Sequence, residues 1–153
     1  MLIVKLESFS TFYPDAIPLL ERHWEEIAHF QDIPLDVDLV LYQAMEEAGA
    51  LRCFAARIDG ELVGYVVYLV RANGHYRKSL QAVQDVLFIA PEHRRSGLGF
   101  SMVKAADDAL RAEGVQAVYQ HSKLAFDIGP FLLPQGYEAV ETIYVKRLDR
   151  PEA

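Results

Sequence analysis

The segment from residue 80 to residue 121 constrains the fold of this chain more than any other part of the sequence. Residues 80–90 are an apolar, β-forming run that ends at Pro91 and predicts a strand. After a glycine-containing loop, apolar residues at helical spacing predict an amphipathic helix over residues 97–113. Residues 115–121 predict another strand. Strands joined through a helix lie parallel in one sheet, so this unit is a parallel crossover.

A hairpin ahead of this unit makes the predicted sheet mixed. Residues 51–58 and 62–70 are apolar runs rich in β-forming residues, and Asp59-Gly60 lies between them. This dipeptide is typical of the tight turn of a β-hairpin. Residues 2–6 alternate loosely between apolar and charged side chains and predict a further strand. Because hairpin strands are antiparallel and crossover strands are parallel, we expect a mixed, twisted sheet.

Two helices are predicted between the first strand and the hairpin. Apolar residues at helical spacing predict a helix that starts at Pro14 and runs to about Phe30. A second helix begins near Leu39 and is stopped by Gly49.

The end of the chain completes the predicted architecture. Residues 123–134 leave room for a short, broken helix, and residues 137–148 predict one long strand, or two joined by a kink or bulge. No linker or repeat divides the sequence. We therefore expect one α/β domain over residues 1–153, with helices on both faces of the sheet.

Composition and charge exclude several classes of protein. The 153 residues contain one cysteine, Cys53, which rules out an internal disulfide framework and a cysteine-built metal site. The formal charge of −7 makes a poor general binder of nucleic acid. No stretch approaches the ~20 apolar residues of a membrane span, and the N-terminus does not resemble a signal peptide. We expect a cytoplasmic protein with no metal, nucleic-acid or membrane partner.

The loop Arg94-Arg95-Ser96-Gly97-Leu98-Gly99 carries the clearest chemical signal. Glycines let the backbone approach a ligand, and the helix N-terminus offers free N–H groups and a positive dipole end. Together they form a cradle for a phosphate or pyrophosphate, to which Arg94 or Arg95 would add charge. The spacing fits neither a P-loop nor the dinucleotide fingerprint. A tight turn with glycines for packing explains the loop, taken alone, equally well.

In its context, this loop resembles the signature of the GNAT family of N-acetyltransferases. That signature is a strand followed by R/Q-x-x-G-x-G/A at the start of a long helix, and residues 94–99 fit every required position. The lead-in at residues 87–92 resembles that of the family, and residues 51–70 resemble its second and third strands. Gly136-Tyr137 resembles a Gly-aromatic pair near the C-terminal strands. The resemblance covers essentially the whole chain.

The resemblance implies acetyl-CoA as a co-substrate. Its pyrophosphate would lie against the loop and the first turn of the helix, and its pantetheine arm would pair with the preceding strand as an added strand would. The residues implied are Arg94, Arg95, Ser96, Gly97, Leu98, Gly99 and Phe100 for the pyrophosphate, and Leu87, Phe88 and Ile89 for the arm. The co-substrate would enter where the two parallel strands separate, and a backbone N–H there would polarise the thioester carbonyl.

Asp85 is the candidate base for such a reaction, because the attacking amine must be unprotonated. It lies near the middle of the strand before the loop, and alternation places it on the face of Val83 and Leu87. The family often has an acidic residue here. A structural salt bridge or hydrogen-bonded carboxylate is the competing role, because a charge on an apolar face is costly unless it is paired.

The group that would protonate the departing thiolate is less clear from the sequence. The family frequently uses a tyrosine, and Leu132 occupies that place in this chain. Tyr119 and His121, on one face of the strand after the crossover helix, are the remaining candidates. A packed aromatic side chain and an ordinary loop histidine are the competing explanations for them.

We therefore predict an acetyl-CoA-dependent N-acetyltransferase in which a primary amine attacks the thioester directly. The alternative is a non-catalytic acyl-CoA-binding or protein-interaction module on the same fold, suggested by the missing tyrosine. A weaker third interpretation is an enzyme that acts on another phosphate-containing ligand. The acceptor is the amine of a small molecule or of a protein. Members of the family are often dimers, and the long final strand offers an edge for a homodimer.

Overall fold

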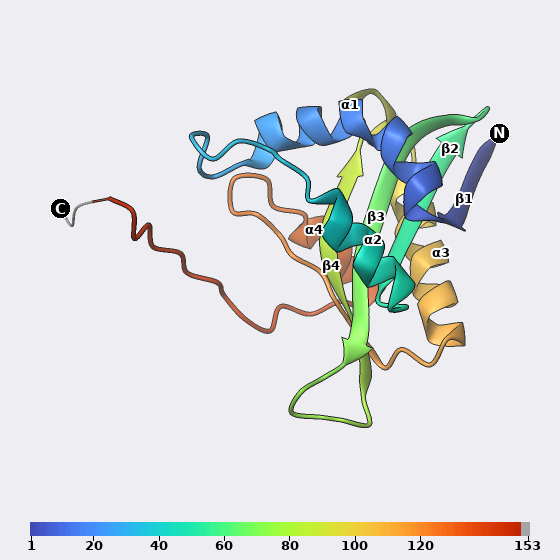
Figure 1. Ribbon diagram of the computed structural model, residues 1–153. Helices are drawn as coiled ribbons and strands as arrows, with labels where there is room; N and C mark the ends of the chain where they lie inside the picture. The colour runs from blue at the N-terminus through green and yellow to red at the C-terminus, as the bar shows by residue number, and fades with distance from the viewer. Residues whose placement is uncertain (151–153) are drawn as a thin grey trace.

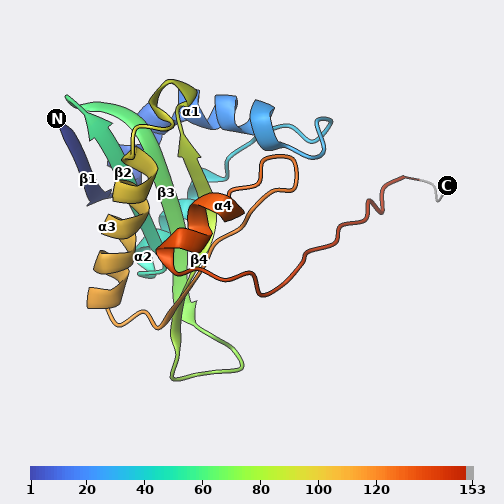
Figure 2. The same cartoon turned by 180° about the vertical axis from the view of Figure 1, so that it is seen from behind.

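The computed structural model describes residues 1–150, which form a sheet between layers of helices (Figures 1 and 2). The strands in this part of the chain are β1 (Leu2–Glu7), β2 (Leu51–Ile58), β3 (Glu61–Ala72), β4 (Leu80–Ile89) and β5 (Ala117–Tyr119). They lie in the order β1-β2-β3-β4-β5. The first four are antiparallel neighbours, and β4 and β5 are parallel. The predicted mixed α/β sheet is confirmed.

Helices cover both faces of the sheet. Helices α1 (Phe9–Ile27) and α2 (Leu39–Glu47) lie on one face, and α3 (Leu98–Ala112) and the short α4 (Gly129–Leu132) lie on the other (Figures 1 and 2). The central strand β3 shows why both layers form. Its Tyr65 and Val67 are buried in the core under α1, whereas Val66 and Tyr68 are buried in the core under α3. No helix within residues 1–150 has the length and apolar character to cross a membrane.

The turn between β2 and β3 has the predicted hairpin geometry. Asp59 has φ of 49° and Gly60 has φ of 87°. Positive φ at both central residues is what a type I′ turn requires, and this turn matches the right-handed twist of the strands. The Asp59 carboxylate also accepts a hydrogen bond from the N-terminal ammonium of Met1 at 2.6 Å.

Helix α1 begins earlier than predicted. It starts at Phe9, and the side chain of its N-cap, Ser8, accepts a hydrogen bond from the amide of Thr11. Pro14 therefore lies inside the helix and not in its first turn. The predicted start was wrong because Phe9 and its neighbours pack into the core. The free energy that this burial contributes outweighs the cost of the backbone hydrogen bond that the proline removes.

The predicted C-terminal strand is absent. Residues 137–148 form no strand, and this segment runs outward from the body of the protein beside α4 (Figures 1 and 2). Strand β5 is also shorter than predicted, with residues 117–119 paired to β4. Since β5 leaves β4 after three residues, it offers a following strand only a short edge. The strand prediction for residues 137–148 was wrong for this reason.

His23 is a buried titratable residue in the core under α1. Its ring stacks on Phe88 of β4, with centroids 4.8 Å apart, and its Nδ1 lies 3.5 Å from the hydroxyl of Tyr65. Burial lowers the pKa of His23 from 6.5 to about 4, because the charged imidazolium loses its hydration there. The neighbouring carboxylate of Glu26 opposes this shift, and Arg94 adds to it.

This burial predicts a loss of stability in mild acid. Between pH 6.5 and about 4 the unfolded chain protonates His23 and the folded chain does not. The free energy of unfolding should therefore fall through this window, by roughly 3 kcal/mol from this group. Urea denaturation at pH 7 and pH 4.5 measures the fall. His23→Phe should reduce it, and His93→Gln, which changes a histidine outside the core, should not. An equal fall in His23→Phe would contradict the prediction.

Candidate active site

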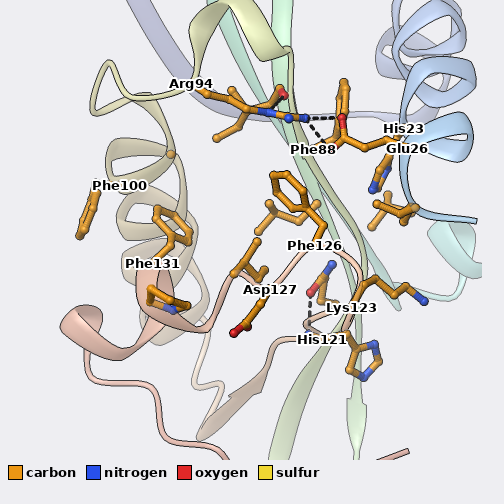
Figure 3. Close-up of a pocket in the computed structure, with 18 of the residues that line it drawn as sticks. His23, Glu26, Phe88, Arg94, Phe100, His121, Lys123, Phe126, Asp127 and Phe131 are labelled. Atoms are coloured by element: carbon orange, nitrogen blue, oxygen red, sulfur yellow. Dashed lines mark hydrogen bonds and ion pairs between the residues drawn. The ribbon is translucent and has the colours of Figure 1, made fainter.

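A cleft of about 730 Å³ opens along β4 where its parallel neighbour leaves it (Figure 3). The ladder between β4 and β5 ends at the pair Val83 and Tyr119, whereas β4 continues to Ile89. Residues 84–89 of β4 therefore border the cleft instead of a neighbouring strand. The other walls of the cleft come from helix α1, the start of α3, the loop over residues 121–128 and α4. The separation occurs between the two strands where the resemblance led us to expect it.

Most of the residues singled out in the sequence meet at this cleft. Its lining includes Asp85, Leu87, Phe88, Ile89, Arg94, Arg95, Gly97, Gly99, Phe100 and His121. Ser96, Leu98 and Tyr119 do not line it. Leu98 is buried in the core under α3, and Ser96 donates a hydrogen bond to the carbonyl of His93 at 2.6 Å, which closes the turn before α3.

Asp85 lies at a β-bulge in β4. Its two neighbours pair with Tyr68 and Val67 of β3, and Asp85 itself has no residue opposite. The bulge changes the face on which the next side chains lie. Leu87 packs with the core under α3, whereas Asp85 reaches α2 and accepts a hydrogen bond from the hydroxyl of Tyr42 at 2.5 Å. The prediction that Asp85 and Leu87 share a face was wrong, because alternation is interrupted at a bulge.

Tyr42 fixes this carboxylate at the edge of the cleft. Its ring stacks on Phe9, with centroids 5.3 Å apart. Burial raises the pKa of Tyr42, and the negative charge of Asp85 raises it further. The phenol therefore keeps its proton and donates it in the hydrogen bond. No local pattern in the sequence indicates this pair, since 43 positions separate the two residues.

The loop before α3 has the backbone geometry of an anion site. Arg95 and Gly97 have φ of 68° and 82°, and α3 begins directly after Gly97. The first amides of α3 point out of the helix end without intrahelical acceptors. Gly99 also has a packing role, because a Cβ there would lie 2.8 Å from Ile89 Cδ1 and 3.0 Å from Phe131 Cε2. The loop thus combines an anion cradle with close packing.

The two arginines of the loop have different surroundings. Arg94 pairs with Glu26 at 2.9 Å, donates from Nε to the carbonyl of Ile89 at 2.9 Å, and lies over the rings of Phe88 and Phe126 (Figure 3). Its charge is thus already compensated within the protein. Arg95 is exposed, and no hydrogen bond or ion pair of its side chain is found within residues 1–150. Arg95 is therefore the loop arginine whose charge is available to an anionic ligand.

His121 and Tyr119 differ in their access to the cleft. His121 is exposed, lines the cleft, and donates from its backbone N–H to Gln84 Oε1 at 2.7 Å (Figure 3). Tyr119 is half-buried at the end of the β4–β5 ladder and does not reach the cleft. Leu132, at the position where the family frequently has a tyrosine, is buried. Its neighbour Phe131 faces the cleft and packs edge-on against Phe100, with centroids 5.2 Å apart.

Comparison with known proteins places this fold in a group of acetyltransferases. The structure is similar to a glucosamine-6-phosphate N-acetyltransferase from Arabidopsis thaliana, with TM-score 0.74, 11% identity, and 97% of this chain and 99% of that chain covered. A ribosomal-protein-alanine N-acetyltransferase from Brucella melitensis gives TM-score 0.72 at 17% identity, covering 97% and 99%. A predicted acetyltransferase from Clostridium acetobutylicum, solved with acetyl-CoA, gives 0.70 at 9% identity, covering 99% and 100%. These likenesses establish the fold.

The sequence itself carries the family assignment. No curated protein matches the chain significantly. The model of the acetyltransferase (GNAT) family, however, matches residues 13–126, which span α1, the hairpin, the glycine-containing loop and most of the cleft. The chain belongs to the GNAT family of N-acetyltransferases.

Proposed function

We propose that the protein transfers the acetyl group of acetyl-CoA to a primary amine, which attacks the thioester directly, and that the whole chain forms one such unit. The observation that carries the proposal is the continuity of the cleft. It joins an unpaired strand edge, residues 84–89 of β4, to the N-terminus of α3. An extended acyl arm ending in a pyrophosphate needs those two surfaces next to each other.

Different parts of the cleft would bind the two ends of such a ligand. The pyrophosphate would accept hydrogen bonds from the amides at the start of α3, beside the exposed guanidinium of Arg95. The amide groups of the arm would pair with the backbone of Leu87, Phe88 and Ile89, as an added strand does. The thioester would then lie near the bulge at Asp85, and a backbone N–H there would stabilise the oxyanion.

Asp85 has the surroundings of a base for the attacking amine. At neutral pH an aliphatic amine is protonated and has no lone pair with which to attack the thioester, so it must first lose a proton. The carboxylate of Asp85 borders the cleft and is held by the hydroxyl of Tyr42. It would accept that proton directly or through a water molecule. The nitrogen then bonds to the thioester carbon, and the carbon–sulfur bond breaks.

His121 is the group best placed to supply a proton to the departing sulfur. It is the exposed cleft-lining histidine that follows β5, and Tyr119 does not reach the cleft. A protonated imidazole would donate to the thiolate as CoA leaves, and the amine nitrogen loses its remaining extra proton to solvent. His121 would thus take the role that the family frequently gives to a tyrosine at the position of the buried Leu132, and the proposed chemistry needs no tyrosine there.

Binding of the co-substrate is tested first. Gly97→Glu puts a side chain at a φ of 82° and a negative charge at the helix end. It should weaken acetyl-CoA binding in calorimetry by about tenfold or more, which is roughly 1.4 kcal/mol. Gly114→Glu is the matched control, because it adds the same charge at a φ of 89° at the far end of α3. Equal affinity in the wild type and Gly97→Glu would show that the loop is only a packed turn.

Turnover is tested separately from binding. Asp85→Asn should lower kcat for CoA release with an accepted amine by about 10²-fold or more, as expected for loss of a general base. It should leave acetyl-CoA affinity unchanged, and Tyr42→Phe should cause a smaller fall in kcat. Asp36→Asn, in an exposed loop away from the cleft, is the control. Acetyl-CoA binding without turnover on any amine of a broad panel would indicate a non-catalytic binding module.

A further inference from the structure

Gln84 is a buried polar side chain at the end of the cleft where β4 and β5 meet. It is the first residue of β4 beyond the ladder with β5, and it is 8% exposed. Its partner across the sheet is Tyr68, which is buried in the core under α3, so Gln84 lies on the same apolar face. An amide in such a place is costly unless its oxygen and its nitrogen both have partners. The partners of this amide therefore indicate its role.

The oxygen of the Gln84 amide is held by the strand that leaves the sheet. Gln84 Oε1 accepts a hydrogen bond from the backbone N–H of His121 at 2.7 Å (Figure 3). This bond also identifies the two ends of the amide, because a backbone N–H needs an acceptor and the oxygen is the acceptor that the amide has. The other end is therefore the nitrogen, Nε2. The side chain bridges β4 and the chain after β5 at the point where the two strands separate.

The nitrogen of the same amide has no partner in the described part of the chain. Within residues 1–150 no hydrogen bond from Gln84 Nε2 is found. Nε2 is not sealed inside the protein either, because the fully buried side-chain atom without a partner in these residues is Gln120 Oε1. Gln84 lines the cleft. Its nitrogen thus presents N–H donors to the cleft, where a ligand can accept from them.

Gln84 and the anion cradle lie at opposite ends of the open edge of β4. The cradle adjoins Ile89, since a Cβ on Gly99 would lie 2.8 Å from Ile89 Cδ1. The open edge runs from Ile89 back to Gln84. A ligand that is anchored at the cradle by its pyrophosphate and paired with residues 87–89 would bring its far end, the acetyl thioester, to Gln84. The carbonyl oxygen of that group is a good acceptor, whereas its sulfur is a weak one.

We propose that Gln84 is a further catalytic residue, whose Nε2 donates a hydrogen bond to the carbonyl oxygen of the bound acetyl thioester. The inference rests on the proposed function. When the amine nitrogen bonds to the thioester carbon, an electron pair of the carbonyl moves to the oxygen, and it returns when the carbon–sulfur bond breaks. Gln84 transfers no proton. Its N–H and the backbone N–H near the bulge stabilise the oxyanion while it exists, and the bond to His121 fixes the amide before the ligand binds.

Two variants of Gln84 separate catalysis from structure. Gln84→Glu keeps an oxygen for the His121 N–H and removes the amide N–H groups. It should lower kcat for CoA release with an accepted amine by about 10²-fold or more at pH 9. It should leave the affinity for CoA, which has no acyl group, unchanged. Gln84→Met removes both the acceptor and the donor and should lower kcat at least as much. Gln116→Glu, exposed and outside the cleft, is the matched control.

The pH dependence of Gln84→Glu gives a reading that a structural role would not produce. A protonated carboxyl has an O–H that can donate in place of the amide. The ratio of wild-type kcat to variant kcat should therefore decrease as the pH is lowered from 9 to 6. A variant that keeps the wild-type kcat at every pH, while Gln84→Met loses it, would overturn the inference, because Gln84 would then only hold the His121 backbone.

Infrared difference spectroscopy measures the proposed hydrogen bond without an acceptor amine. Acetyl-CoA labelled with ¹³C at the carbonyl should show a lower carbonyl stretching frequency when bound to the wild type than in water-free solvent. Gln84→Glu at pH 9 should raise that frequency. The same frequency in both proteins would overturn the inference, even if the wild type acetylates amines. A raised frequency in a protein that acetylates no amine would support the hydrogen bond and contradict the proposed function.

Discussion

The separation of β4 from β5 is the constraint on which the cleft depends. Unpaired backbone groups inside a sheet are costly unless another partner satisfies them. Two side chains supply such partners here. Gln84 accepts from the backbone N–H of His121 at 2.7 Å, and Arg94 donates to the carbonyl of Ile89 at 2.9 Å. These contacts lie at the two ends of the open segment and satisfy backbone groups there, and the edge between them stays available.

Arg94 connects this opening to the rest of the protein. Its guanidinium joins the end of β4 to Glu26 of α1 and to Phe126 of the loop that closes the cleft. An arginine with these partners is unsuited to bind a phosphate as well. A protein of net charge −7 must therefore attract an anionic co-substrate locally. The amides at the start of α3 and the exposed Arg95 are the groups that remain for this attraction.

Much of the fold could be predicted because its signals are local. Asp59-Gly60 defines a hairpin within a few residues, and residues 80–121 define a parallel crossover by their periodicity alone. What failed depends on contacts distant in sequence. The start of α1 depends on the burial of Phe9, and pairing of residues 137–148 depends on an edge that β5 offers for only three residues. The cleft residues of the loop were predicted from their motif, whereas the contact of Tyr42 with Asp85 spans 43 positions and has no sequence signal.

The bulge in β4 joins the geometry of the sheet to its proposed chemistry. Leu80 and Ala82 pack with the core under α3, so regular alternation already places Asp85 on the opposite face. The extra residue exchanges the faces of the side chains that follow it, and Leu87 therefore returns to the core under α3. The face under α3 is filled with apolar side chains, and a carboxylate there would lack a partner. On the face of α2 the carboxylate meets the hydroxyl of Tyr42 and still borders the cleft. One inserted residue thus allows Leu87 and Ile89 to pack in an apolar core while Asp85, two positions before Leu87, lies on the other face of the same strand.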